Sequence, residues 1–340
     1  MVVVTGATRH IGNVLVRQLL ARGDKVRVLI PPAKDITPLK GLKVEMVEGD
    51  VCNINSLIQA FRDSDIVYHL ASIISILPGR DNKLLDQVNV TGTQNVIEAC
   101  METGVQRLVY TSSIHAIEEP PHGTMIDETL HCNPDRVPKG YGRSKALATL
   151  AVLDGVERGL NAMIVHPTGV IGPYDYRISE MGQLTIDFVN GNLKAYIDGT
   201  YDFVDVRDVS RGIILAGDKG QSGERYILSG EQITVRQLML MLQEISGVQA
   251  PSLRMPVWLA RIAAGFSPFY YKLTRRKPRF TTYSIDVLCS NSLICSDKAR
   301  RELGFTARPA RQSISDATSW FKENGYINPG QNLNRRGSHE

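Results

Sequence analysis

The chain has 340 residues, enough for one large domain or two smaller ones with a sizeable core. Its composition of 43% hydrophobic and 22% charged residues excludes a disordered, collagen-like or coiled-coil protein. The formal net charge of +4 is too small and too dispersed to indicate nucleic acid as a partner. Five cysteines without a C-x-x-C spacing favour reduced thiols, so we expect a cytoplasmic protein without a disulfide framework.

Short β-branched runs alternate with helical patterns through the first half of the chain. A helix is expected from residue 11 onward, and others at 56–62, 91–103 and 141–157. Strands are expected at 2–4, 25–30, 43–47, 65–70, 107–111 and 160–166. This alternation predicts an α/β protein with a doubly wound parallel sheet that is covered on both faces.

After Pro173 the alternation weakens, with strand-like runs at 203–206 and 225–228 and a helix at 235–246. We therefore expect a main domain at 1–173 plus about 203–230. A smaller domain, interleaved with it, is expected at about 174–202 and 231–330. The polar end at 331–340 is expected to be a mobile tail.

Two glycines lie in and just after the turn between the first expected strand and the first expected helix. Gly6 would permit a tight turn, and Gly12 would let the helix pack closely on the strand. The free N–H groups of the first helical turn attract a pyrophosphate. The turn therefore predicts a dinucleotide site, and an ordinary glycine-rich turn is the weaker alternative. The residues between the glycines are expected to line this site: Thr8, Arg9, His10 and Ile11.

The end of the second strand decides which nicotinamide cofactor such a site prefers. An acid there bonds the ribose hydroxyls of NAD, whereas basic groups pair with the phosphate of NADP. Here Pro31-Pro32-Ala33-Lys34 follows the strand, so the acid is missing, and Arg9 lies close by. The sequence favours NADP(H), and NAD(H) stays an alternative because Asp35 follows directly.

A catalytic set is predicted from three side chains. Tyr141 and Lys145 are four residues apart on one face of a helix, where the ammonium would lower the pKa of the phenol. Ser113 follows the strand at 107–111, at the edge where α/β sheets place their chemistry. A phenol, an ammonium and a hydroxyl together can move a proton to a carbonyl oxygen. No metal site is expected, because the local His and Cys residues match no zinc spacing.

These motifs occur in an order that resembles the extended short-chain dehydrogenase/reductases, from Val2 to about Tyr326. The resemblance is carried by Thr5 to Gly12, Gly49-Asp50-Val51, Asp65 to Ala71, Asn89 to Thr93, Tyr110 to Ser113, Tyr141 to Lys145 and His166 to Pro173. It implies a Rossmann fold with a smaller substrate domain, and an enzyme that uses NAD or NADP. Arg9 departs from the family's usual glycine, and Thr149 from its usual glutamate.

The resemblance also implies roles for further residues. Asp50 and Val51 would flank the adenine, and Leu70 and Ala71 would line the ribose side. Asn89 would support the cofactor, and Lys145 would also hold the nicotinamide ribose. The residues beside the nicotinamide would be Pro167, Thr168 and Gly169. Relatives pair through the helices that match 91–103 and 141–154, so a homodimer is expected.

Two substrate classes fit the resemblance. The branch that includes dihydroflavonol 4-reductase and 3β-hydroxysteroid dehydrogenase acts on bulky rings, and it is favoured because both usual diphosphate contacts of the sugar-nucleotide branch are missing. A nucleotide-sugar epimerase or dehydratase with retained NAD is the alternative, and a non-catalytic nucleotide sensor is the third. The expected pocket walls are His115, Tyr174, Tyr176 and Arg177.

The sequence contains no run long enough to span a membrane. The segment at 256–279 combines apolar and aromatic residues with a basic cluster, so peripheral contact with an anionic membrane is one reading. A packed helix with a solvated basic end is the favoured one, because three prolines interrupt the pattern.

Overall fold

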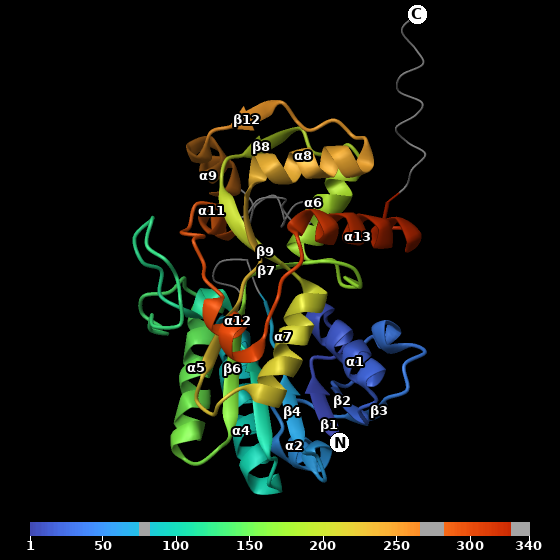
Figure 1. Cartoon of the computed structure of the whole chain (residues 1–340), viewed down its shortest axis with the longest axis vertical. Coiled ribbons are helices and arrows are strands. Elements are labelled where there is room, and N and C mark those ends of the chain that lie inside the picture. Colours follow the sequence, from blue (N-terminus) through green and yellow to red (C-terminus); the bar gives the residue numbers. More distant parts are fainter. Residues whose placement is uncertain (75–81, 266–281, 328–340) are drawn as a thin grey trace, which may run out of the picture.

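Seven parallel strands form the central sheet of the protein, in the order β10-β6-β5-β4-β1-β2-β3 (Figure 1). The computed structural model describes residues 1–74, 82–265 and 282–327. The strands are β1 (Val2–Thr5), β2 (Val26–Ile30), β3 (Glu45–Glu48), β4 (Ile66–His69), β5 (Arg107–Thr111), β6 (Ala162–Pro167) and β10 (Arg225–Leu228). Their parallel pairing confirms the predicted fold class.

Helices cover both faces of this sheet because successive side chains of a strand point to opposite faces. Val4 of β1 packs in one core layer with α1 and α7, whereas its neighbour Val3 packs in the other with α2, α4 and α5. The helices around the sheet are α1 (His10–Arg22), α2 (Ile54–Phe61), α3 (Asn82–Leu85), α4 (Gly92–Thr103), α5 (Tyr141–Glu157), α7 (Val206–Lys219) and α12 (Asp297–Leu303). Shorter turns are the 3₁₀ helices η1 (Thr37–Leu39) and η3 (Ile114–Ala116) and the π-helix η2 (Asp86–Thr91).

A second unit, called the upper unit here, lies above the carboxyl ends of the large sheet in Figure 1. It has a three-stranded sheet of β7 (Gly169–Ile171), β9 (Thr200–Asp205) and β11 (Glu231–Thr234), and a pair of β8 (Ala195–Ile197) and β12 (Leu253–Met255). Its helices are α6 (Glu180–Val189), α8 (Val235–Ser246), α9 (Val257–Gly265), α11 (Thr282–Leu288) and α13 (Ala310–Glu323).

The chain crosses between the two units several times. Ala299 and Leu303 of α12, and Phe305 two residues after it, are buried in a core layer of the large sheet, although α11 and α13 on either side belong to the upper unit. The expected domain boundaries stay a prediction, and the expected tail at 331–340 lies outside the described residues. The units are therefore interleaved in sequence and not simply consecutive.

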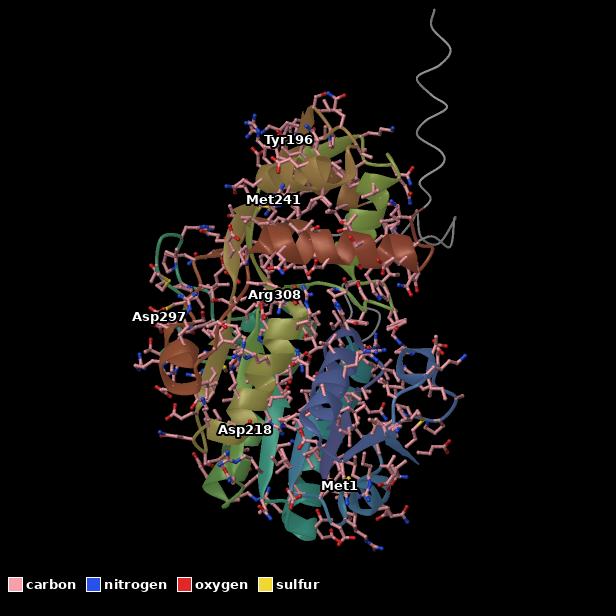
Figure 2. The ribbon with its side chains drawn as sticks, turned by 45° about the vertical axis from the view of Figure 1, so that its right-hand side comes forward. Met1, Tyr196, Asp218, Met241, Asp297 and Arg308 are labelled. Carbon is pink, nitrogen blue, oxygen red and sulfur yellow. The ribbon has the colours of Figure 1, made fainter. Side chains whose placement is uncertain are left out.

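Ion pairs connect the units where α7 begins. Arg308, which lies between them in Figure 2, donates to both oxygens of Asp208 at 2.8 and 3.0 Å. Arg207 bonds the buried carboxylate of Asp205 at 2.7 Å and reaches Asp316 of α13 at 2.6 Å. Bidentate pairs of this kind fix orientation as well as distance. The start of α7 is thereby held against α13.

Helix α9 is packed along one side only, which is less burial than the packed helix that the sequence favoured would have. Its inward side is narrow: Ala260 and Ala264 are buried against Ile197 and Ile285, and Val257 is half-buried beside them. Its large apolar side chains point outward, with Trp258 64% and Ile262 53% exposed. The basic cluster that follows lies outside the described residues. Among the described helices, none is long and apolar enough to cross a membrane.

Candidate active site

The glycine turn between β1 and α1 is held against the end of β4. The hydroxyl of Thr5 accepts the N–H groups of Leu70 and Ala71, at 3.2 and 3.1 Å. Gly6 has a φ of +75°, and a Cβ there would lie 2.8 Å from the backbone of Ala71. A Cβ on Gly12 would collide with the carbonyl of Gly6. Both glycines are therefore required by the backbone geometry.

The first turn of α1 is open to an anion. No side chain caps the N-terminus of α1, and its first turn holds no acidic residue. Thr8 is buried and Ile11 half-buried, while the Nε2–H of His10 donates to the carbonyl of Pro173 at 2.9 Å. Free N–H groups at the positive end of a helix dipole fit a pyrophosphate. The turn therefore fits the dinucleotide that the sequence predicts.

Three cations gather beside this turn. Desolvation and the neighbouring Arg177 lower the pKa of Arg9. Desolvation, Arg177 and Arg9 together lower the pKa of Lys34. The carboxylate of Asp35 accepts the N–H of Thr37 at 2.9 Å, and this bond and nearby cations lower its pKa. The structure therefore places Arg177, expected in the substrate pocket, with the two residues expected to choose the cofactor.

The residues expected around the adenine and ribose lie along the ends of β3 and β4. The exposed Asp50 accepts the N–H of Cys52 at 2.9 Å, and Val51 is buried. Leu70 is buried and Ala71 half-buried, both on the turn that Thr5 holds. These four residues stay predictions for cofactor contact.

Asn89 lies on the π-helix η2 and joins two parts of the site. Its Oδ1 accepts the N–H of Ile73 at 2.8 Å, and its Nδ2 donates to the carbonyl of Ile73 and to Ser144 of α5, both at 3.0 Å. The side chain is 1% exposed. Asn89 thus fixes the segment after β4 against the helix that carries Tyr141 and Lys145.

Ser113 follows β5 and begins η3. Its hydroxyl accepts the N–H of His115 at 3.3 Å, and its carbonyl accepts the Nδ1–H of His166 at 2.9 Å. On the neighbouring α5, a Cβ on Gly142 would lie 2.8 Å from the carbonyl of His115. Because Gly142 has no side chain, the first turn of α5 packs directly on η3, and this brings Tyr141 to Ser113.

The phenol of Tyr141 and the ammonium of Lys145 are both buried. A hydrogen bond with Ser113 lowers the pKa of Tyr141, but burial outweighs it and raises that pKa to about 12. Burial lowers the pKa of Lys145 to about 7. The expectation that Lys145 lowers the pKa of Tyr141 is therefore wrong for this structure. The physical reason is that Lys145 donates its Nζ–H to the carbonyl of Thr111, at 2.8 Å, and lies over the Tyr110 ring.

Thr149 stands where the resembled family usually has a glutamate, and the structure shows what it contacts instead. Its hydroxyl shares a 2.8 Å hydrogen bond with Ser112, one turn along α5 from Lys145. The buried serine therefore has a partner without a glutamate.

The residues expected beside the nicotinamide lie where the chain passes from β6 to β7. Pro167 ends β6, and the hydroxyl of Thr168 donates to the buried carboxylate of Asp202 at 2.6 Å. A Cβ on Gly169 would lie 2.7 Å from the ring of Tyr201. This passage is therefore packed tightly against β9 of the upper unit.

Tyr201 is a site residue that sequence reasoning missed. Its hydroxyl is 2.9 Å from the Nε2 of His115, and the two rings stack with centroids 6.0 Å apart. Tyr201 thereby brings β9 to the residue two positions after Ser113. A tyrosine on a strand gave no signal of this contact, because β9 is far from η3 in the sequence.

Tyr174 and Tyr176, expected as pocket walls, pack elsewhere in the described structure. Both rings contact Trp320 of α13, with centroids 6.3 and 5.0 Å away. Tyr174 also lies over the guanidinium of Arg17 of α1, 4.6 Å from its carbon. These two tyrosines therefore join α1 to α13. Of the four expected pocket residues, only His115 lies beside Ser113.

The fold and the glycine turn together define a dinucleotide-dependent enzyme. The chain belongs to the NAD dependent epimerase/dehydratase family, whose sequence profile matches residues 2–229. This membership confirms the resemblance to the extended short-chain dehydrogenase/reductases. Its relatives are named reductases and dehydrogenases, and the chain is an NAD(P)-dependent oxidoreductase.

Three relatives resemble the chain over nearly its whole length. It is 39% identical to the sterol demethylase protein B of Methylococcus capsulatus, covering 95% of this chain and 99% of that one. It is 30% identical to a putative dihydroflavonol 4-reductase of Synechocystis, covering 95% of each. The crystal structure of gox2253 superimposes with a TM-score of 0.85 at 33% identity, covering 96% of this chain and 99% of that one.

Proposed function

We propose that this protein is an NADP-preferring reductase or dehydrogenase that interconverts a ketone and a secondary alcohol on a bulky cyclic substrate. The observation that carries the proposal is the meeting of Ser113, at the end of β5, with Tyr141 and Lys145 on α5. The buried phenol lies within hydrogen-bonding reach of the serine hydroxyl, and the ammonium is one helical turn away.

In the reduction, Tyr141 donates its proton to the carbonyl oxygen. A pKa raised to about 12 keeps the phenol protonated at neutral pH, as this donor must be. Ser113 donates a hydrogen bond to the same oxygen. The nicotinamide, when bound, supplies the hydride to the carbonyl carbon, so the two additions give the secondary alcohol. In the oxidation, the phenolate form of Tyr141 takes the proton back.

Lys145 has a positioning role in this proposal. Its 2.8 Å bond to the carbonyl of Thr111 keeps the ammonium beside the end of β5. From there it would hold the nicotinamide ribose. The glycine turn with Gly6 and Gly12 would hold the pyrophosphate, and Arg9 and Lys34 would favour the 2′-phosphate of NADP(H).

The substrate class rests on the relatives and on the residues near Ser113. The names of two relatives refer to a sterol and to a dihydroflavonol, both fused-ring compounds. The stacked rings of His115 and Tyr201 lie beside Ser113, and in this proposal they would form the aromatic wall against such a ring system.

A first experiment separates the proposal from its alternatives. The purified protein is denatured, any nucleotide it releases is identified, and the emptied protein is titrated with NADPH and NADH. We expect no retained nucleotide and tighter binding of NADPH, followed by NADPH oxidation with steroid or flavonoid ketones. Retained NAD, with no turnover of ring ketones, would replace the proposal by an epimerase or dehydratase. Cofactor binding without any turnover would indicate a nucleotide sensor.

The proposal includes a homodimer. The helices that relatives use for pairing, α4 and α5, carry the exposed apolar side chains Met101 and Leu150. Light scattering at micromolar protein concentration tests it, and a mass near 37.6 kDa would rule out a stable dimer.

A further inference from the structure

Arg177 lies on a segment that leaves the upper unit and runs along α1. This segment, 173–178, follows β7 and precedes α6. The carbonyl of Pro173 accepts a hydrogen bond from His10, and the Tyr174 ring covers Arg17. The Tyr176 hydroxyl is 3.5 Å from the guanidinium of Arg17, which itself donates to the carbonyl of Pro38 at 3.3 Å. The segment is therefore fixed beside both the glycine turn and the loop that follows β2.

The backbone around Arg177 is held in an uncommon conformation. Tyr174 and Ile178 have φ values of +68° and +36°, a region that side chains other than glycine rarely adopt. The buried carboxylate of Asp175 accepts the N–H and the hydroxyl of Ser179, at 2.8 and 2.6 Å, and so closes the segment. Arg177 is thereby presented by a short, internally bonded loop.

The guanidinium of Arg177 has an unused donor. Its Nε is buried and makes no hydrogen bond. A buried donor without a partner is costly and calls for an explanation, and an ion that binds there is one. Arg177, Arg9 and Lys34 repel one another, and none of the three forms an ion pair with a carboxylate in the described ranges. Asp35 faces Arg177, and its Oδ1 is bonded to Thr37.

We propose that Arg177 completes, with Arg9 and Lys34, the site that binds the 2′-phosphate of NADP(H). This inference rests on the cofactor preference proposed above. It adds Arg177 to the glycine turn and the end of β2, the two places that usually decide between NAD and NADP. A phosphate monoester is close to a dianion at neutral pH, and a guanidinium can bond two of its oxygens at once. Because Arg177 comes from the loop between β7 and α6, the phosphate would join that loop to the loop after β2.

Binding of cofactors and of their adenosine halves tests this inference. Kd values are measured by titration calorimetry for NADPH, NADH, 2′,5′-ADP and 5′-AMP, with the wild type and Arg177→Gln. We expect the variant to bind NADPH and 2′,5′-ADP about 10- to 100-fold more weakly, the range expected for a lost charged hydrogen bond. NADH and 5′-AMP should change less than about twofold.

Two matched variants control the experiment. Arg177→Lys keeps the charge but loses the fork of donors, so it should restore part of the binding of 2′,5′-ADP. Arg211→Gln removes an exposed arginine of α7 and should bind all four ligands like the wild type. Equal losses for NADPH and NADH in Arg177→Gln would overturn the inference, because Arg177 would then not respond to the phosphate. A wild type without preference for NADPH would instead overturn the proposed cofactor choice.

A second measurement uses only the wild-type protein and so does not depend on the folding of a variant. Amide hydrogen exchange of residues 173–179 is followed with saturating NADPH and with saturating NADH. We expect stronger protection with NADPH, since only its 2′-phosphate reaches Arg177. Identical protection by the two cofactors would contradict the proposed contact.

Discussion

The large sheet and the upper unit contribute different things to the proposed site. The large sheet carries the glycine turn, Ser113, Tyr141 and Lys145, all on elements that are joined to neighbouring strands of one sheet. The upper unit contributes Tyr201 and the loop of Arg177, which come from separate parts of the chain. In the proposed mechanism the large sheet provides the proton transfer, while the upper unit selects the substrate and the cofactor phosphate.

Acidification tests how far stability depends on the large sheet. Burial lowers the pKa of His69 and of His166 to about 3, and both rings are completely buried. Because the unfolded chain takes up these protons first, stability is lost as the pH falls from about 6.5 toward 3. We expect a loss of up to about 3 kcal/mol per pH unit for the two together.

Urea unfolding at pH 7, 6 and 5 measures this loss. His166→Asn should unfold with a shallower dependence on pH than the wild type. The exposed His122 is the control, and His122→Gln should follow the wild type. If the free energy of unfolding fell equally steeply with pH in the wild type and in His166→Asn, His166 would not be a cause of the acid destabilisation.

Removal of the Tyr141 hydroxyl tests the proton transfer directly. Tyr141→Phe should lower kcat at least about 100-fold, the lower end of what a positioned acid contributes, while the Kd of NADPH stays unchanged. Tyr196→Phe, a half-buried tyrosine far up in the upper unit (Figure 2), is the matched control and should turn over normally. Near-normal turnover of Tyr141→Phe would remove this residue from the mechanism.

Because the ammonium of Lys145 is buried, we expect the stability of the protein to depend on pH in the alkaline range as well. Its pKa is about 7 in the folded protein, against 10.5 for an ordinary lysine. The unfolded chain therefore holds the proton more tightly, and stability should rise by up to about 1.4 kcal/mol per unit between pH 7 and 10. In Lys145→Met this rise should be missing, whereas Lys139→Met, an exposed lysine before α5, should keep it. Unfolding curves at pH 7, 8 and 9 decide between these outcomes.

The smallest effect is expected in the upper unit. Tyr201→Phe removes the 2.9 Å contact with His115 but keeps the ring. We expect KM for a ring ketone to rise about 2- to 10-fold, the range for a single neutral hydrogen bond, with the Kd of NADPH unchanged. A fall in kcat alone, at constant KM, would place Tyr201 with the proton transfer and weaken the division between the two units.

The elements of the large sheet could be predicted because their signals are local. The strand expected at 107–111 matches β5, and the helix expected at 141–157 matches α5. A buried parallel strand needs a continuous apolar run, and the helix that follows needs one apolar face, so each is encoded by adjacent residues. In the upper unit, the helix expected at 235–246 matches α8. Its signal is also local, because the helix begins with a capping box at Thr234.

Contacts between distant segments could not be predicted in this way. Tyr174 and Tyr176 follow the nicotinamide-side segment and were expected in the pocket, yet their rings pack on Trp320, almost 150 residues later. Helix α9 was expected to be packed, but it is buried along one side only, at Ala260 and Ala264 with the half-buried Val257. Hydrophobic character therefore did not indicate which neighbour the two tyrosines would contact, nor that Trp258 and Ile262 of α9 would be exposed.

The sequence by itself determined the fold class, the glycine turn and the family, because each depends on residue types at short, fixed spacings. Only the tertiary structure decided that Arg177 lies with Arg9 and Lys34, that Tyr201 meets His115, and that burial raises the pKa of Tyr141. Those outcomes depend on which surfaces meet and on how much water they exclude. Electrostatic and hydrogen-bond energies change with distance and burial, and neither is written in the spacing of residues along the chain.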